Sequence, residues 1–208
     1  MNLANEGRRA RLSPETRRSQ LLVCSIAVFA EHGIARATHS QVAEKAGVSV
    51  AAVYSYFRTR GDLVSATLVE VARYLREILE GTLEKGLPPF DALIDLGRAF
   101  ALGAQANPDV IRVWLDWSTG VGLESWPTYL QALDQFQRAA EQILIDGKRQ
   151  GVVPDCLNVK AAARICLSGG HAVALMQLTA DSSSEDLEIF IDQLVRGAMG
   201  IAADAIIA

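Results

Sequence analysis

Apolar residues recur at intervals of three and four along almost the whole chain, and strict alternation of apolar and polar residues is hard to find. A period near 3.6 places apolar side chains on one face of an α-helix, whereas strands need a period of two. Half of the 208 residues are hydrophobic, so such helices can bury a substantial core. The sequence therefore predicts an all-α protein of about nine helices.

Glycines, prolines and capping hydroxyls indicate where these helices begin and end. Ser13 followed by Pro14 can start the first helix, and Gly33 can end it. Further breakers predict helices over residues 39–46, 50–57, 59–85, 90–106, 108–119, 126–150, 159–180 and 185–207. We place the domain boundary in the fourth helix, which gives a domain over residues 1–60 and a second over residues 61–208.

Charge is distributed unevenly along the chain. Nine basic and four acidic residues occur through Arg60, although the whole chain has a net charge of −4. The first segment thus carries +5 and the remainder −9, which is typical of a basic nucleic-acid-binding module joined to an acidic body. In the basic segment, Gly47 separates the two short helices, which is the arrangement of a helix-turn-helix DNA-binding module.

The stretch GVSVAAVYSYF, residues 47–57, combines small residues with three aromatic rings. Small side chains let a helix approach base edges in the major groove. Val53 and Phe57 are four residues apart and can pack back on the preceding helices, which leaves Tyr54 and Tyr56 for bases and phosphates. Tyr56 is the expected phosphate contact. The alternative is a compact helical hairpin with surface tyrosines.

The segment RLSPETRRSQLLVCSIAVFAEHGIARATHSQVAEKAGVSVAAVYSYFRTRGDLV resembles the DNA-binding domain of TetR-family regulators in its turn GVS, its final YF and the basic residue that opens the fourth helix. RARLSP, VSVAAVYSYFRTRGDLV and VWLDWSTGVGLESWP resemble, more narrowly, the LuxR/HapR/SmcR-type quorum-sensing master regulators. This resemblance implies that Arg9 and Arg11 enter the minor groove from an extended arm. The alternative for the two arginines is a disordered basic tail. Ser55 stands where the subgroup usually has asparagine, so we expect a different operator sequence.

The candidate DNA contacts come from the arm, the two short helices and the start of the fourth helix. They are Arg9, Arg11, Thr38, His39, Ser49, Val50, Ala52, Tyr54, Ser55, Tyr56 and Arg60.

TetR relatives resemble two-state devices in which a ligand in the helical body changes the spacing of two DNA-binding heads. We therefore expect a cavity for a small apolar ligand in the second domain. Candidate lining residues, chosen for aromatic or polar character on inward faces and partly by resemblance, are Tyr74, Ile78, Phe100, Trp114, Trp117, Tyr129, Leu133, Phe136, Gln137 and His171. The alternative is that the rings only fill a core, with Gln137 and His171 bonded to carbonyls or waters.

The partners expected are a double-stranded DNA operator and a second copy of the chain. The last two long helices carry small residues that favour close helix packing, so we expect the homodimer to form through them. Pseudo-palindromic half-sites would follow its two-fold axis. The alternative functions are a general TetR-type ligand-responsive repressor of a local gene outside quorum sensing, and an all-α small-molecule-binding protein without a DNA function.

The sequence lacks the features that are typical of metalloproteins, enzymes and membrane proteins. The three cysteines are widely spaced and the three histidines have no metal-binding spacing, so reduced thiols and no metal or other cofactor are expected. Catalytic motifs are missing, which argues against an enzyme. With no apolar run of about 18 residues and no signal peptide, the expectation is a cytoplasmic protein without membrane contact.

Overall fold

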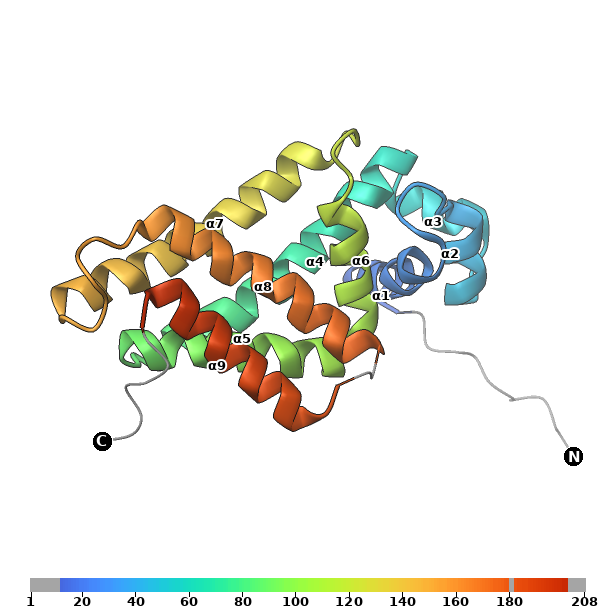
Figure 1. Cartoon of the computed structure of the whole chain (residues 1–208). Helices are drawn as coiled ribbons and strands as arrows, with labels where there is room; N and C mark the ends of the chain where they lie inside the picture. Colours follow the sequence, from blue (N-terminus) through green and yellow to red (C-terminus); the bar gives the residue numbers. More distant parts are fainter. Residues whose placement is uncertain (1–11, 180–181, 202–208) are drawn as a thin grey trace, which may run out of the picture. The chain divides into compact units, whose positions relative to one another are not determined.

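The computed structural model describes residues 12–179 and 182–201, so the expected arm residues Arg9 and Arg11 lie outside the described residues. Over these ranges the chain forms nine α-helices and no strand, which confirms the predicted fold class (Figure 1). The chain divides into two compact units, the first extending to Thr67 and the second beginning at Leu68. Helix α4 (Arg60–Leu83) contains the boundary between them.

The first unit contains α1 (Pro14–His32), α2 (His39–Ala46), α3 (Val50–Tyr56) and the start of α4. Helix α1 begins as predicted, because the Ser13 hydroxyl accepts a hydrogen bond from the backbone N–H of Thr16 at 3.1 Å. It ends at Gly33, which has a φ of 82°. The core of the unit contains Phe29 and Val42, both of which are almost fully buried.

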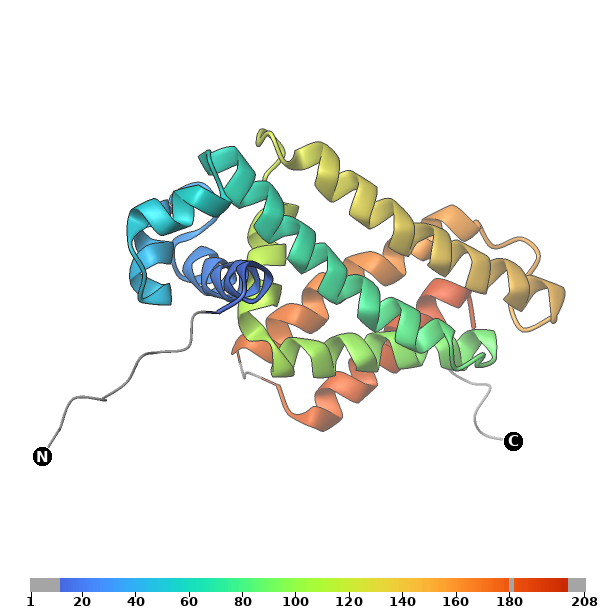
Figure 2. The ribbon, with the colours of Figure 1, turned by 180° about the vertical axis from the view of Figure 1, so that it is seen from behind.

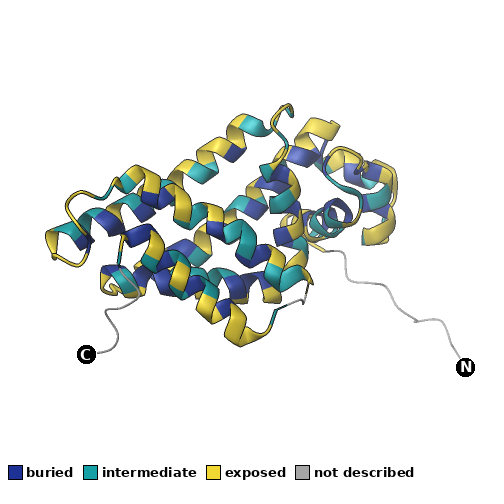
Figure 3. Ribbon diagram, in the orientation of Figure 1, coloured by how far each residue is buried: buried dark blue, intermediate teal, exposed yellow. Residues whose placement is uncertain are grey.

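The second unit contains the rest of α4 and five further helices. These are α5 (Pro89–Ala106), α6 (Pro108–Ser118), α7 (Trp126–Arg149), α8 (Val159–Thr179) and α9 (Ser184–Met199). Helix α8 packs against α5, α7 and α9 and is the central element of this bundle (Figures 1 and 2). Figure 3 shows buried and exposed residues alternating along these helices, as their sequence periodicity predicts.

Helix α9 is shorter than predicted at its C-terminal end. The expected helix continued to residue 207, but α9 ends at Met199 because Gly200 takes the left-handed conformation with a φ of 69°. The next residue closes the turn, since the N–H of Ile201 donates to the carbonyl of Arg196 at 3.0 Å. A glycine in this position is a common helix terminator. In the described part of the chain, none of the helices is both long and apolar enough to cross a bilayer.

Candidate DNA-binding surface and ligand cavity

Helix α2 is fixed at both ends by local hydrogen bonds. At its start, the Thr38 hydroxyl accepts from the N–H of Gln41 at 3.4 Å, and the Gln41 side-chain oxygen accepts from the N–H of Thr38 at 2.9 Å. This reciprocal pair is a capping box, which satisfies two otherwise unpaired donors. Gly47 ends the helix with a φ of 65°, in the left-handed region that glycine tolerates best. The turn and the caps together set the angle between α2 and α3.

Helix α3 has one buried face and one exposed face. The Ser49 hydroxyl caps it by accepting from the N–H of Ala52 at 3.2 Å. Val53 and Phe57 are buried in the first unit, as predicted. The opposite face exposes Tyr54 and Ser55, and Tyr54 retains 48% of its surface. A helix held in this way can present its exposed face to a DNA groove.

The structure places the predicted DNA contacts in three different environments. Thr38, Ser49, Val50, Tyr54 and Ser55 are exposed, and Ala52 and Tyr56 are partly buried. The imidazole of His39 is enclosed, with only 5% of the residue exposed. Arg60, the first residue of α4, is exposed, and its guanidinium donates to the carbonyls of Ala37, at 3.3 Å, and Ile34. Direct DNA contact by any of these residues stays a prediction.

His39 connects the two short helices through contacts that sequence reasoning missed. Its Nε2 lies 2.8 Å from the carbonyl oxygen of Phe57, and its ring stacks on Tyr54 with centroids 4.1 Å apart and planes inclined by 6°. The Arg18 guanidinium lies 5.6 Å from the centroid of the Phe57 ring and forms a cation–π contact with it. None of these three contacts has a sequence motif, because all of them depend on how α1, α2 and α3 pack.

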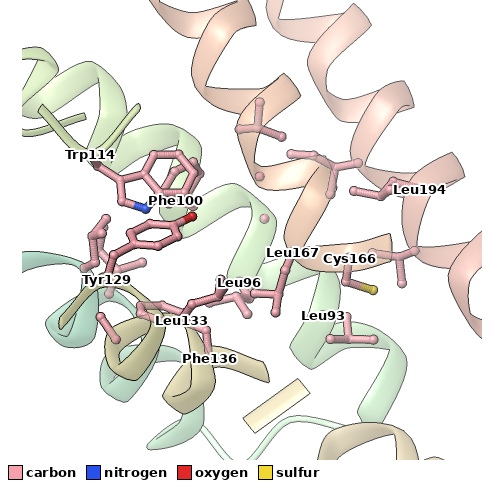
Figure 4. A pocket seen from close by; sticks show the side chains of 18 of the residues that line it. Leu93, Leu96, Phe100, Trp114, Tyr129, Leu133, Phe136, Cys166, Leu167 and Leu194 are labelled. Atoms are coloured by element: carbon pink, nitrogen blue, oxygen red, sulfur yellow. The ribbon is translucent and has the colours of Figure 1, made fainter. Parts of the chain in front are cut away.

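The second unit contains a cavity of about 110 Å³ lined by side chains of α4 to α9 (Figure 4). Of the predicted ligand residues, the lining contains Ile78, Phe100, Trp114, Trp117, Tyr129, Leu133 and Phe136. Figure 4 shows the rings of Phe100, Trp114 and Tyr129 gathered on one side of the cavity, with Cys166 on the other. Sequence reasoning missed Cys166 and the small and aliphatic lining residues, since they have no feature that separates them from ordinary core residues.

Three predicted ligand residues are not in the lining. The Tyr74 hydroxyl donates to the carbonyl of Gly103 at 2.8 Å. The Gln137 amide donates to the Glu141 carboxylate at 2.9 Å, one turn further along α7. His171 contacts a lining residue instead, because its ring centroid lies 4.4 Å from that of Trp114. Each of the three residues therefore bonds to or packs on a neighbouring group and is not one of the lining residues.

The cavity lining carries no charged side chain. Its polar groups belong to tryptophan, tyrosine and cysteine side chains, and the Trp117 ring N–H already donates to the carbonyl of Ser125 at 3.2 Å. Burial raises the pKa of the Cys166 thiol to about 11, so the thiol is neutral at physiological pH. Burial also raises the pKa of Tyr129. An apolar, uncharged environment favours an uncharged ligand. The described residues contain no cluster of three or more His, Cys, Asp or Glu that could hold a metal ion.

Helices α8 and α9 expose apolar side chains. Ile165 and Leu175 on α8 and Ile189 on α9 each keep about half of their surface exposed. Gly197 on α9 has open space where a Cβ would lie, whereas a Cβ at Gly169 would meet Leu194 at 2.0 Å. Gly169 therefore serves the packing of α8 on α9 within one chain, and the open glycine and the exposed apolar residues face outward.

Comparisons with known proteins match both units of the chain. Residues 21–67 match the family described as bacterial regulatory proteins, tetR family. The chain is 32% identical over 147 residues to the HTH-type transcriptional regulator LuxR of Vibrio harveyi, which covers 71% of this chain and 72% of that protein. A TetR-like transcriptional regulator from Rhodococcus sp. RHA1 has a similar fold, with a TM-score of 0.78 and 19% identity over 91% of this chain and 100% of that one. FadR of Bacillus subtilis, solved in complex with stearoyl-CoA, gives a TM-score of 0.72 and 18% identity over 88% of this chain and 98% of that one.

Proposed function

The chain belongs to the TetR family of bacterial regulatory proteins, and from this premise we propose that it is a quorum-sensing master regulator that binds a pseudo-palindromic operator as a homodimer. TetR-family regulators bind DNA operators and act as dimers. The identity to LuxR over most of both chains supports the narrower assignment. Because this family consists of regulators, we infer no catalytic role and an action in the cytoplasm, where the chromosome lies.

The observation that carries the proposal is the exposed face of α3. Tyr54 and Ser55 project from a helix that is capped at Ser49 and anchored from behind by Val53 and Phe57. This arrangement brings small side chains and one aromatic ring to the surface that would enter the major groove. We propose that Tyr54 contacts a base edge and that Tyr56 contacts a phosphate. Thr38, Ser49, Val50 and Ala52 would border the same contact.

The Ser55 hydroxyl has a further consequence for the operator. It donates to the carbonyl of Ala52 at 2.7 Å, which occupies its only proton. An asparagine in this place could both donate to and accept from an adenine, but this serine can only accept while it keeps that bond. We infer an operator in which Ser55 does not read an adenine through a bidentate pair, because it can only accept from the base that it faces. Arg9 and Arg11 would add a preference for A·T-rich flanks from the minor groove.

The ligand that we propose for the cavity is small, uncharged and mostly apolar. Seven predicted ligand residues line the cavity, and the lining holds neither a cation nor an anion. A bound carboxylate or phosphate would lose its hydration there without gaining a partner charge. FadR of Bacillus subtilis has the same fold and was solved with stearoyl-CoA. We propose that this chain does not place the charged part of such a molecule in its cavity.

The homodimer would form through the outward faces of α8 and α9. Ile165 and Leu175 lie ten residues apart on α8, and the exposed Ile189 and the open Gly197 lie on α9. Two such helices from each copy could form a four-helix contact about a two-fold axis. We propose a functional division after Arg60, with the DNA contacts within residues 1–60 and the ligand and dimer contacts within residues 61–208.

Selection of bound fragments from a sheared genomic library tests the proposed function. A master regulator is expected to recover many dispersed sites that share a two-fold-symmetric motif. Recovery of one or two sites beside a neighbouring gene would instead support the alternative, a local ligand-responsive repressor. An absence of enrichment over competitor DNA, repeated after extraction of apolar ligands and refolding, would contradict DNA regulation altogether.

A further inference from the structure

His39 and Tyr54 form a stacked pair with unequal exposure. Their ring centroids lie 4.1 Å apart and their planes differ by 6°. His39 is 5% exposed and Tyr54 is 48% exposed, so the imidazole is the inner ring and the phenol the outer one. The inner ring belongs to the first residue of α2, and the outer ring to the middle of α3. The outer ring thus rests on a surface supplied by the other helix.

The imidazole is itself fixed by a hydrogen bond. Its Nε2 lies 2.8 Å from the carbonyl oxygen of Phe57, the residue that directly follows α3. A carbonyl oxygen can only accept, so Nε2 carries the proton and donates it. Phe57 is itself almost completely buried. His39 is therefore held at the end of α3 and supports a ring one turn earlier in the same helix.

A tyrosine on an exposed helix face ordinarily samples several rotamers, which lets its ring edge and hydroxyl move relative to the groove. A parallel ring 4.1 Å away favours one of these orientations. Base discrimination depends on placing donor, acceptor and apolar groups against one base edge. Constraint on the Tyr54 ring therefore acts on sequence preference as well as on affinity.

We propose that His39 is a positioning residue for sequence recognition: its ring orients Tyr54, and the stack sets the base preference at the operator position that Tyr54 contacts. This proposal rests on the proposed function, because it needs an operator. In this proposal the enclosed imidazole acts through the Tyr54 ring and needs no base contact of its own. The hydrogen bond to Phe57 orients the imidazole, and the stacked ring orients the tyrosine.

Two substitutions separate the ring from the hydrogen bond. His39→Phe keeps a planar ring that can stack on Tyr54 but removes the donor to Phe57, whereas His39→Gln keeps a donor and removes the ring. Each variant, the wild type and Tyr54→Ala would be titrated against the selected operator and its single-base-pair variants. Thermal unfolding of each variant would establish that it is folded at the assay temperature.

The expected result is a loss of preference at one symmetric operator position. His39→Gln should reduce discrimination there roughly tenfold, to the level of Tyr54→Ala, whereas His39→Phe should retain most of it. The double variant His39→Gln with Tyr54→Ala should show no further loss at that position, because the two residues act as one unit.

Two results would overturn the proposal. A folded His39→Gln protein that binds all sequences more weakly but keeps the wild-type preference would show that His39 only stabilises the helix-turn-helix. Equal loss of preference in His39→Phe and His39→Gln would assign the effect to the hydrogen bond instead of the stack. A wild-type protein that selects no operator would contradict the proposed function itself. Titration of the wild type alone distinguishes this outcome from a failure of the His39 proposal.

Discussion

Tyr56 is the last residue of α3 and is partly exposed. Replacement by phenylalanine removes only its hydroxyl. If this hydroxyl donates to a phosphate, Tyr56→Phe should weaken binding to the operator and to a scrambled duplex alike, by at least roughly tenfold, because a hydrogen bond to a charged group contributes about 1.5–3 kcal/mol. Fluorescence anisotropy with both duplexes measures this. A changed base preference at unchanged affinity would contradict the phosphate assignment.

His171 predicts a pH dependence of stability in the second unit. Burial lowers its pKa, although a backbone hydrogen bond at Leu167 opposes the shift. The unfolded chain therefore binds the proton more readily, and this contribution to stability is complete above the ordinary pKa of about 6.5. It decreases as the pH falls from there through the lowered pKa.

The matched variant for this test is His171→Phe, which keeps a ring beside Trp114 but cannot titrate. Urea unfolding at about pH 7.5 and about pH 5.5 should show a smaller loss of stability in the variant than in the wild type. Equal losses in the two proteins would indicate that His171 does not contribute.

Individual side chains show where sequence reasoning reaches its limit. The rings of Trp114 and Trp117 line the cavity as expected, because residues three apart share a face of α6. Gln137 does not line the cavity. Its side-chain amide donates a hydrogen bond to the carboxylate of Glu141, which lies one turn away on α7. The enclosure of His39 was equally hidden, since it depends on the angle between α2 and α3.

At the scale of elements, α8 and α9 are packed so closely that an added methyl group would clash at one of two adjacent glycines and fit at the other. A Cβ at Gly169 would meet Leu194 at 2.0 Å, whereas at Gly170 nothing lies within 4 Å. Gly169→Ala should lower the free energy of unfolding by about 1 kcal/mol or more, because overpacking outweighs the gain in helix propensity. Gly170→Ala should raise it by up to about 1 kcal/mol. Urea unfolding of both variants provides the measurement, and equal effects would contradict this packing.

Most elements were predictable from local signals. Ser13 and Pro14 start α1, Thr38 caps α2, and Ser49 caps α3, each as the sequence indicates. The end of α9 was not, because Gly200 lies in a run of small and apolar residues that also suits a continuing helix. Only its left-handed conformation separates a terminating glycine from one that permits close packing.

For the whole molecule, the proposed dimerisation through α8 and α9 predicts that a carboxylate introduced on these helices disrupts the dimer, whereas one introduced elsewhere on the surface does not. Ile165→Glu places a carboxylate in the proposed contact, so the protein should become monomeric and lose affinity for the full operator. Leu102→Glu on α5 is the matched control, since Leu102 is 66% exposed but lies outside that contact. Sedimentation velocity measures the oligomeric state. A dimeric Ile165→Glu protein would contradict this interface.

The division of charge along the chain provides the most direct test of DNA regulation. The whole chain has a net negative charge, but the segment through Arg60 has a net positive charge. Binding through that segment would neutralise phosphates and release counterions, so affinity must depend steeply on salt.

Titration of the best selected operator and of a scrambled duplex, each at about 50 mM and about 200 mM salt, is therefore the decisive measurement. A homodimeric regulator should prefer the operator at both concentrations and lose at least roughly a hundredfold in affinity between them. Binding that is insensitive to salt, or equal for the two duplexes, would contradict sequence-specific recognition by the basic segment.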